Sequence, residues 1–172
     1  IIESSKLQDN YYELNARGLV IDLCRDLVKP LGPLSSVRSA SALLYVMAGI
    51  QCRELNLDEL ILLNGEGRIA ETVNSNIFLV SGTTIFTPGL DQGCISGVMR
   101  RVILGIAAES GFRVNDQSSL TPAVLMDADE VFMTNSVDGI RWAGAYGQRR
   151  YYRKTAQLLN RKLNELAFSS GS

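Results

Sequence analysis

Short runs of β-branched and other large apolar residues, bounded by Gly, Pro, Asn or Ser, predict strands along most of the chain. They lie at residues 19–23, 60–63, 68–71, 77–80, 84–87, 112–114, 131–134 and 140–146. Two neighbouring pairs of runs are joined by short polar turns, at Asn64-Gly65 and at Ser81-Gly82. These turns predict hairpins, and the Asn64-Gly65 pair is expected to take the positive φ of the first turn.

Three longer stretches repeat apolar residues at helical spacing, at 40–54, 97–110 and 151–166. Ser39 or Ser41 is placed to cap the first of these helices. A shorter helix is expected at 123–126.

Strands outnumber helices, and hairpins mix with helices without a regular βαβ alternation. The pattern therefore predicts an α+β domain around a curved or barrel-like mixed sheet with flanking helices. We expect one domain over residues 1–168, followed by a flexible tail at 169–172.

Composition narrows the classes of partner. The 172 residues include 17 basic and 18 acidic side chains, so the formal net charge is −1 and no basic surface for nucleic acid is expected. Charged residues interrupt each apolar run before it reaches the length of about 18 residues that a membrane span needs. The three cysteines are widely spaced and form no C-x-x-C pair, which favours a reducing, cytoplasmic compartment.

Histidine is absent from the chain. This excludes Ser-His-Asp and Cys-His catalytic arrangements and histidine-rich metal sites. Any chemistry must come from lysine, carboxylates, tyrosine or a bound cofactor.

Two segments suit charged groups of a ligand, although each has an ordinary structural explanation. Gly97-Val98-Met99 feeds a helix whose first backbone N–H groups can hold a phosphate, or it is a plain helix start. Glu71 is either a carboxylate that meets a cationic group or a solvated strand end, with Asn74 and Asn76 in turns.

Two further polar segments follow. Residues 134–139, Thr-Asn-Ser-Val-Asp-Gly, form either a ligand-binding loop at a strand end or an ordinary turn. The acidic residues Asp127, Asp129 and Glu130 lack the ligand spacing of a calcium loop, so we expect a solvated helix-to-strand junction and no metal site.

Three motifs in order resemble those of class IV aminotransferases. They are E-x-x-x-x-N before an apolar strand at Glu71 to Asn76, T-P-x-L-x-x-G-x-x-x-G-V-M-R at Thr87 to Arg100, and A-D-E-V-F-M-T-N-S-x-x-G-I at Ala128 to Ile140. The resemblance covers roughly residues 11 to 166. It implies the larger, second domain of a fold-type IV enzyme that uses pyridoxal phosphate, acts on amino acids or keto acids and usually forms homodimers. On this resemblance, we expect the smaller first domain of that family to be missing from the sequence.

The resemblance also implies roles for particular residues. Glu71 matches the carboxylate that pairs with the pyridine nitrogen of the cofactor. The N–H groups of Val98 and Met99 match the phosphate cradle, to which Ser136 and Val137 add further donors. Asn76 and Gly97 complete the expected cofactor site.

Arg38 stands where relatives carry the lysine that forms a Schiff base with the cofactor. A neutral lysine amine condenses with the cofactor aldehyde and then moves a proton between two substrate carbons. A guanidinium has a pKa above about 12 and stays charged, so Arg38 is expected to do neither. Lys29 is the nearest lysine in sequence but does not align with the motif.

The sequence thus predicts an amino-acid aminotransferase domain that is inactive, holding its cofactor non-covalently at best. Met99 and the Leu90-Asp91-Gln92 segment lean slightly towards aminodeoxychorismate lyase, the second choice. One alternative from another class is a non-catalytic domain that binds a phosphate ligand. Another is a dimer-forming remnant whose interface contains aromatic residues, although aromatics at this spacing are more often in the core; they are Trp142, Tyr146, Tyr151 and Tyr152.

Overall fold

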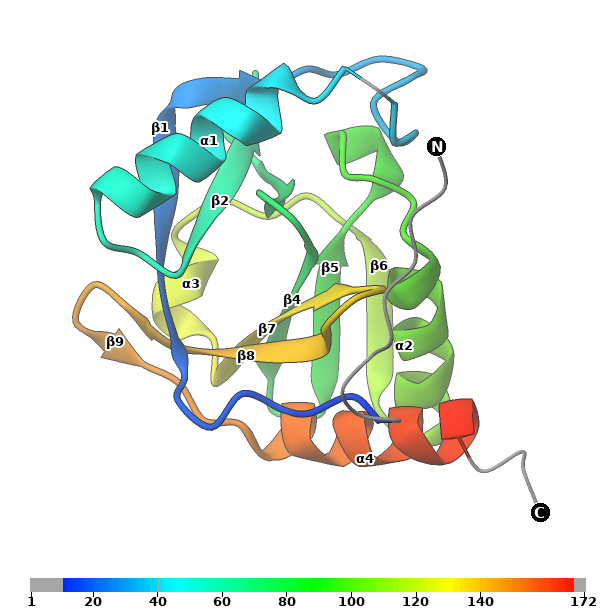
Figure 1. Cartoon of the computed structure of the whole chain (residues 1–172). Coiled ribbons are helices and arrows are strands. Elements are labelled where there is room, and N and C mark those ends of the chain that lie inside the picture. The colour runs from blue at the N-terminus through cyan, green and yellow to red at the C-terminus, as the bar shows by residue number, and fades with distance from the viewer. Residues whose placement is uncertain (1–10, 40, 169–172) are drawn as a thin grey trace, which may run out of the picture.

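The computed structural model describes residues 11–39 and 41–168, which form one sheet of nine strands with helices packed around it (Figure 1). In chain order the elements are β1 (Leu19–Lys29), α1 (Leu43–Glu54), β2 (Glu59–Asn64), β3 (Ile69–Thr72), β4 (Asn76–Ser81), β5 (Thr84–Pro88), the 3-10 helix η1 (Leu90–Gln92), α2 (Val98–Glu109), β6 (Arg113–Ser118), α3 (Val124–Asp127), β7 (Glu130–Asn135), β8 (Gly139–Tyr146), β9 (Arg149–Arg150) and α4 (Lys154–Phe168).

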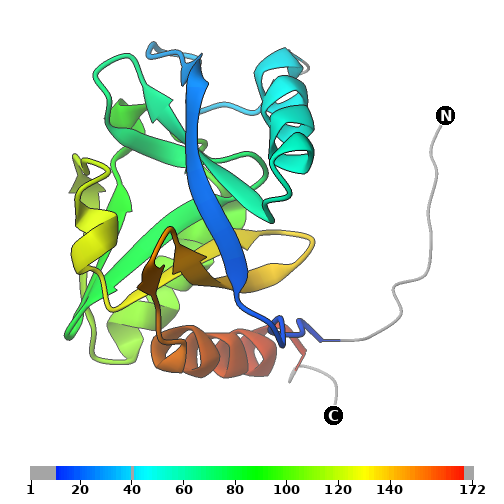
Figure 2. The same ribbon diagram turned by 90° about the vertical axis from the view of Figure 1, so that its left-hand side faces the viewer.

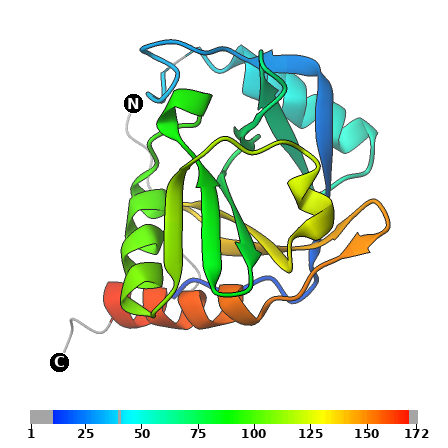
Figure 3. The ribbon, with the colours of Figure 1, turned by 180° about the vertical axis from the view of Figure 1, so that it is seen from behind.

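The sheet has the strand order β3-β2-β1-β8-β7-β4-β5-β6, and β9 pairs with β8. Three pairings are parallel, namely β1 with β2, β1 with β8, and β5 with β6, and the others are antiparallel. The backbone N–H of Ile69 in edge strand β3 donates to the carbonyl of Leu120, just after the other edge strand, at 2.8 Å. The sheet therefore curls back on itself, as Figures 1 and 3 show from opposite sides. The predicted α+β fold with a barrel-like mixed sheet is confirmed.

Strands β4 and β7 are buried on both faces, which explains their continuous apolar runs. Successive side chains of a strand point to opposite faces, so Ile77 and Met133 enter the core inside the curled sheet. Phe78 and Phe132 point the other way, where their rings stack with centroids 5.0 Å apart beneath α2 and α4.

The helices cover two separate parts of the sheet. Helices α2 and α4 pack together over the Phe78 and Phe132 cluster. Helix α1 packs on β1 and β2 through Ala48 and Cys52, at the other end of the molecule from α4 (Figure 2). Within the described residues, no helix is both long and apolar enough to cross a membrane.

Several local expectations differ from the structure. Helix α1 begins after Ala42 and has no side-chain cap, so the serine cap is wrong. In the first hairpin Gly67, not the Asn64-Gly65 pair, has the positive φ of 71°, because Asn64 Oδ1 accepts the N–H groups of Glu66 and Arg68 and shapes the turn. The predicted tail at 169–172 lies outside the described residues.

Candidate ligand site at the start of helix α2

A cavity of about 630 Å³ opens where α2 begins, between the ends of β3, β4 and β7 and the segment before α1. This volume lies within the range of about 300 to 1,000 Å³ that is usual for small-molecule sites. Its lining includes all eight candidate residues from the sequence, namely Arg38, Glu71, Asn76, Gly97, Val98, Met99, Ser136 and Val137. The fold thus brings four separate segments of the chain to one place.

The start of α2, with its first backbone N–H groups, lies at the edge of this cavity. No side chain of the described residues caps the helix, whose first residues Val98 and Met99 line the cavity. A Cβ atom at Gly97 would lie 2.2 Å from Asn76 Oδ1, so glycine is required for this approach. Asn76 is fixed in turn, because its Nδ2 donates to the carbonyl of Ile95 at 2.8 Å. The expected turn at Asn76 is therefore wrong, and the residue begins β4.

Thr134 begins the polar segment 134–139 noted in the sequence, but it was not among the eight candidate site residues. The residue lines the cavity at 2% exposure, yet its Oγ1 has no hydrogen-bond partner among the described residues. A buried hydroxyl without a partner is costly, so such an atom marks a position where a ligand or water oxygen fits. Strand alternation could have found it, since Thr134 shares the α2-facing side of β7 with Phe132.

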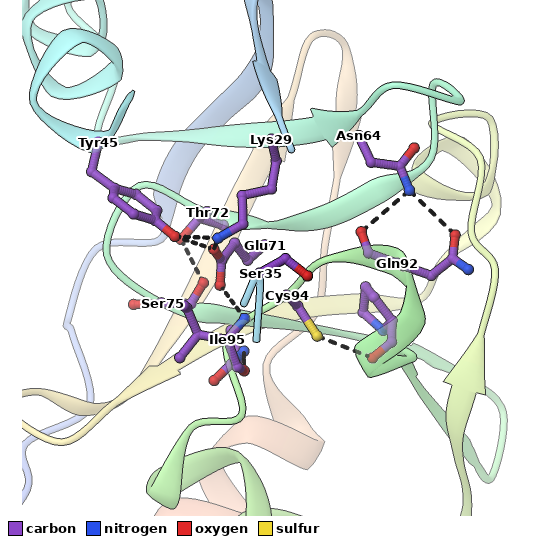
Figure 4. Close-up of polar contacts among 12 residues, drawn as sticks. Lys29, Ser35, Tyr45, Asn64, Glu71, Thr72, Ser75, Gln92, Cys94 and Ile95 are labelled. Atoms are coloured by element: carbon purple, nitrogen blue, oxygen red, sulfur yellow. Dashed lines mark hydrogen bonds and ion pairs between the residues drawn. The ribbon is translucent and has the colours of Figure 1, made fainter. Parts of the chain in front are cut away.

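Glu71 lies in the wall of the cavity at 3% exposure, so its interpretation as a solvated strand end is wrong. Figure 4 shows its carboxylate held from three sides. Oε1 lies 2.8 Å from Lys29 Nζ and accepts a hydrogen bond of 2.6 Å from the Tyr45 hydroxyl. Oε2 accepts the backbone N–H of Ile95 at 2.8 Å. The cationic partner expected for Glu71 is thus already present within the chain.

Lys29, the last residue of β1, is committed to this ion pair. It is 4% exposed, and its ammonium also donates to the Tyr45 hydroxyl. Burial and the neighbouring Glu71 carboxylate raise the pKa of Tyr45 well above its usual value, so the phenol stays protonated and donates to Glu71. Lys29 does not line the cavity, and neither does any other lysine in the part of the chain that the structure describes.

Arg38 also lines the cavity and is exposed. Its guanidinium carbon lies 5.6 Å from the centroid of the Tyr45 ring. It forms no ion pair with another described residue.

The loop after β7 differs from expectation in one respect. Asn135 Oδ1 accepts the N–H groups of Val137 at 2.8 Å and Asp138 at 2.7 Å. The Val137 amide is therefore already used by the turn and is not a free donor, whereas Ser136 presents an exposed side chain at the rim.

Cys94 and the acidic segment around Glu130 contain further titratable side chains, and in both cases the surrounding structure explains them. Burial raises the pKa of Cys94, which lies beside the Glu71 network, to about 11, so it stays a thiol. Glu130 of the acidic segment is buried, contrary to the solvated junction expected, and accepts backbone N–H groups of α4. Among the residues that the structure describes, no cluster of three or more His, Cys, Asp or Glu could hold a metal ion.

Comparisons with known proteins agree on one family. A model described as amino-transferase class IV matches residues 6–144. A probable branched-chain-amino-acid aminotransferase of Synechocystis sp. is 36% identical over 104 residues, which is 60% of this chain and 34% of that protein. An aminodeoxychorismate lyase of Vibrio harveyi is 30% identical over 133 residues, which is 76% of this chain and 48% of that protein.

A solved structure gives the same answer for the fold. Branched-chain amino acid aminotransferase from Thermobaculum terrenum, crystallised in its PLP form, superposes with a TM-score of 0.80 at 18% identity, over 90% of this chain and 52% of that one. The chain thus spans about a third to a half of the length of these proteins. With the family model matching well over half of its residues, the chain belongs to the amino-transferase class IV family.

Proposed function

We propose that this chain is the cofactor-binding part of an amino-acid aminotransferase that holds pyridoxal phosphate non-covalently and is inactive because Arg38 replaces the Schiff-base lysine. The class IV family uses this cofactor. The single observation that carries the proposal is the common cavity, which gathers the motif residues but is lined by no lysine among the described residues. A homodimer in the cytoplasm, acting on amino or keto acids, is part of the same proposal.

The residues present suit the phosphate end of the cofactor. The uncapped start of α2 offers N–H groups and a positive dipole, and Gly97 leaves the space that a side chain would fill. The Thr134 hydroxyl lacks a partner that a phosphate oxygen would supply. These groups would hold the phosphate without help from a charged side chain.

They also suit the ring end. A carboxylate has about four acceptor positions, and the contacts of Glu71 with Lys29, Tyr45 and Ile95 occupy three of them. One position on Oε2 remains for the ring nitrogen. When bound, pyridoxal phosphate supplies an electron sink for charge that develops on a substrate carbon.

Among the described residues, no free lysine amine lines the cavity for the covalent link. The Arg38 guanidinium stays charged and is a poor nucleophile. Lys29 is the only lysine near the Glu71 network within residues 11–39 and 41–168, and its ammonium is held by Glu71 and Tyr45. Taking its proton away would leave Glu71 as a buried carboxylate without its cation, which is strongly unfavourable.

Aminodeoxychorismate lyase is the second candidate. The Vibrio harveyi lyase matches a larger share of this chain than the Synechocystis aminotransferase does, although at lower identity. Met99 and Leu90-Asp91-Gln92 favour the same choice. The aminotransferase stays first because the Synechocystis aminotransferase has the higher identity, 36% against 30%.

The test is a titration with pyridoxal phosphate, followed by borohydride reduction and peptide mapping. We expect saturable binding that dialysis reverses, and no reduced adduct at Lys29 or near residue 38. A stoichiometric adduct at Lys29 would refute non-covalent binding, and absence of any binding would refute the cofactor site itself. An adduct confined to Lys154 or Lys162, which lie on α4 away from the cavity, leaves the expected result unchanged.

Two threonines provide a matched pair of variants. Thr134→Val removes the hydroxyl without a partner, so affinity for pyridoxal phosphate should fall about fivefold while stability changes little. Thr87 is equally buried, but its Oγ1 donates to the carbonyl of Ile77 at 2.8 Å. Thr87→Val should therefore lower stability by about 1 kcal/mol and leave affinity unchanged. Equal affinities in both variants would remove Thr134 from the site.

A further inference from the structure

No described acidic side chain forms an ion pair with the positive charge of Arg38 in the cavity. The charged side chains in its lining are Arg38, Glu71 and Asp138. Lys29 neutralises Glu71 from outside the cavity, at 2.8 Å. Asp138 sits on the exposed rim, where it accepts a hydrogen bond from Asn135 Nδ2 at 2.9 Å. Arg38 is left as a cation that faces the cavity without an ion-pair partner among the described residues.

The Arg38 guanidinium is placed to receive an anion. It lies over the Tyr45 ring, a contact that favours a defined orientation of the planar group. Tyr45 is itself fixed by its hydrogen bond to Glu71. A guanidinium offers parallel N–H donors whose spacing matches the two oxygens of a carboxylate. A lysine ammonium at this position would offer only a point charge.

The same cavity lining offers a second place for an anion. It includes the first residues of α2, whose N–H groups have no side-chain cap, and the unpartnered hydroxyl of Thr134, which together suit a phosphate. A ligand that uses both places carries two anionic groups on one small framework. The cavity volume of about 630 Å³ suits a single substituted ring between them.

We propose that this site takes a phosphorylated aromatic carboxylate, bound non-covalently, with its phosphate at the start of α2 and its carboxylate paired with Arg38. The inference rests on the proposed function, in which the aldehyde-bearing side of the cofactor ring faces residue 38. It goes further, because a carboxylate there is preferred over an aldehyde or an alcohol. Arg38 is then a ligand-recognition residue and not merely the loss of a lysine.

The test compares two probes that differ only at ring position 4. They are 4-pyridoxic acid 5'-phosphate, which carries a carboxylate, and pyridoxine 5'-phosphate, which carries a neutral hydroxymethyl group. Isothermal titration of the full chain should show about tenfold tighter binding of the acid, as expected for one charge-assisted pair at a partly exposed site. In Arg38→Gln the two probes should bind within about twofold of each other. Arg53→Gln removes an equal charge from an exposed residue near the end of α1, outside the cavity lining, and should keep the preference.

The outcomes separate this inference from the proposed function. Equal binding of both probes to the unchanged chain, or a preference that survives in Arg38→Gln, overturns the carboxylate assignment and leaves the cofactor site standing. If neither probe nor pyridoxal phosphate binds a chain whose circular dichroism shows it to be folded, both proposals fail. Loss of the preference in Arg53→Gln as well as in Arg38→Gln would reduce the effect to overall charge and overturn the role of Arg38.

Discussion

A helix begins near each end of strand β7, namely α4 near Glu130 and α2 near Thr134. The two helix starts differ in what accepts their first N–H groups. At one end the Glu130 carboxylate accepts the N–H of Thr155 at 2.8 and 2.9 Å and that of Ala156 at 3.2 Å, which caps α4. Glu130 is 5% exposed. At the other end Thr134 lies beside the start of α2, where no side chain of the described residues provides a cap.

The difference separates a structural helix start from a candidate binding site. In both helices the first N–H groups have no acceptor within the helix itself, and these groups and the positive end of the helix dipole attract an anion. At α4 the protein supplies that anion itself and buries it. At α2 it supplies glycine, a hydroxyl without a partner and a cavity instead. A negative group from outside the chain is what this end lacks.

Removing the Glu130 carboxylate should have the largest effect on stability. Glu130→Ala leaves the N–H groups of Thr155 and Ala156 buried without an acceptor, so the free energy of unfolding should fall by about 3 kcal/mol. Urea denaturation measures this. Glu165→Ala is the control, because Glu165 is exposed and its contact with Arg161 is 3.9 Å, so stability should change by less than about 0.5 kcal/mol. Similar losses in both variants would contradict the capping role.

Glu59 extends the comparison to a third buried carboxylate. Unlike Glu130 it caps no helix, and unlike Glu71 it pairs with no lysine among the described residues. Its Oε1 accepts the N–H groups of Leu60 at 3.2 Å and Val73 at 3.1 Å, and burial raises its pKa from 4.5 to about 7. Between these two values the folded chain binds more protons than the unfolded chain. Stability should therefore fall as pH rises through this window, by roughly 3 kcal/mol in total, and should change no further from this cause above it.

Glu59→Gln tests the sign of that effect. The amide keeps an acceptor but carries no charge, so the variant should be about 2 kcal/mol more stable than the unchanged chain at pH 8, with a flatter profile between pH 5 and 7. Urea unfolding at pH 5, 6, 7 and 8 would show it. An unchanged slope in Glu59→Gln would mean that this carboxyl does not titrate in the window.

The smallest predicted effect concerns the open helix start. Gly97→Ala places a Cβ where Asn76 Oδ1 lies 2.2 Å away, so one of the two must move, and affinity for pyridoxal phosphate should fall about tenfold. Gly105→Ala, in the interior of the same helix, meets nothing within 4 Å. It should raise stability by up to about 1 kcal/mol without changing affinity. Equal affinities in the two variants would show that the space at Gly97 is not part of the site.

Local pattern was enough for much of the fold. Residues 77–80 and 84–87 alternate or run apolar, and they form the hairpin of β4 and β5 as expected. The motif residues also met in one cavity, because a motif spaced along the chain records a constraint of the folded family. The two-residue strand β9 was missed, since Arg149-Arg150 has no apolar signal and is set by its pairing with β8.

Partners brought together only by tertiary structure could not be predicted. The Lys29 pairing with Glu71 joins β1 to β3, which lie on either side of β2, and nothing in the local sequence indicates it. Glu130 was grouped with its acidic neighbours, although its fate depends on where α4 begins. Charged residues are normally expected at the surface, so burial of a carboxylate can be predicted only when its partner is known.

The curl of the sheet has a consequence for any occupant of the cavity. Glu71 belongs to β3, at one edge of the sheet. Helix α2 connects β5 to β6, the strands at the other edge. A molecule touching both would span the line along which the barrel closes, in parallel with the bond from Ile69 to Leu120. Occupancy and resistance to unfolding would then rise together with ligand concentration, so that even without turnover the ligand would act as a reversible cross-link of the fold.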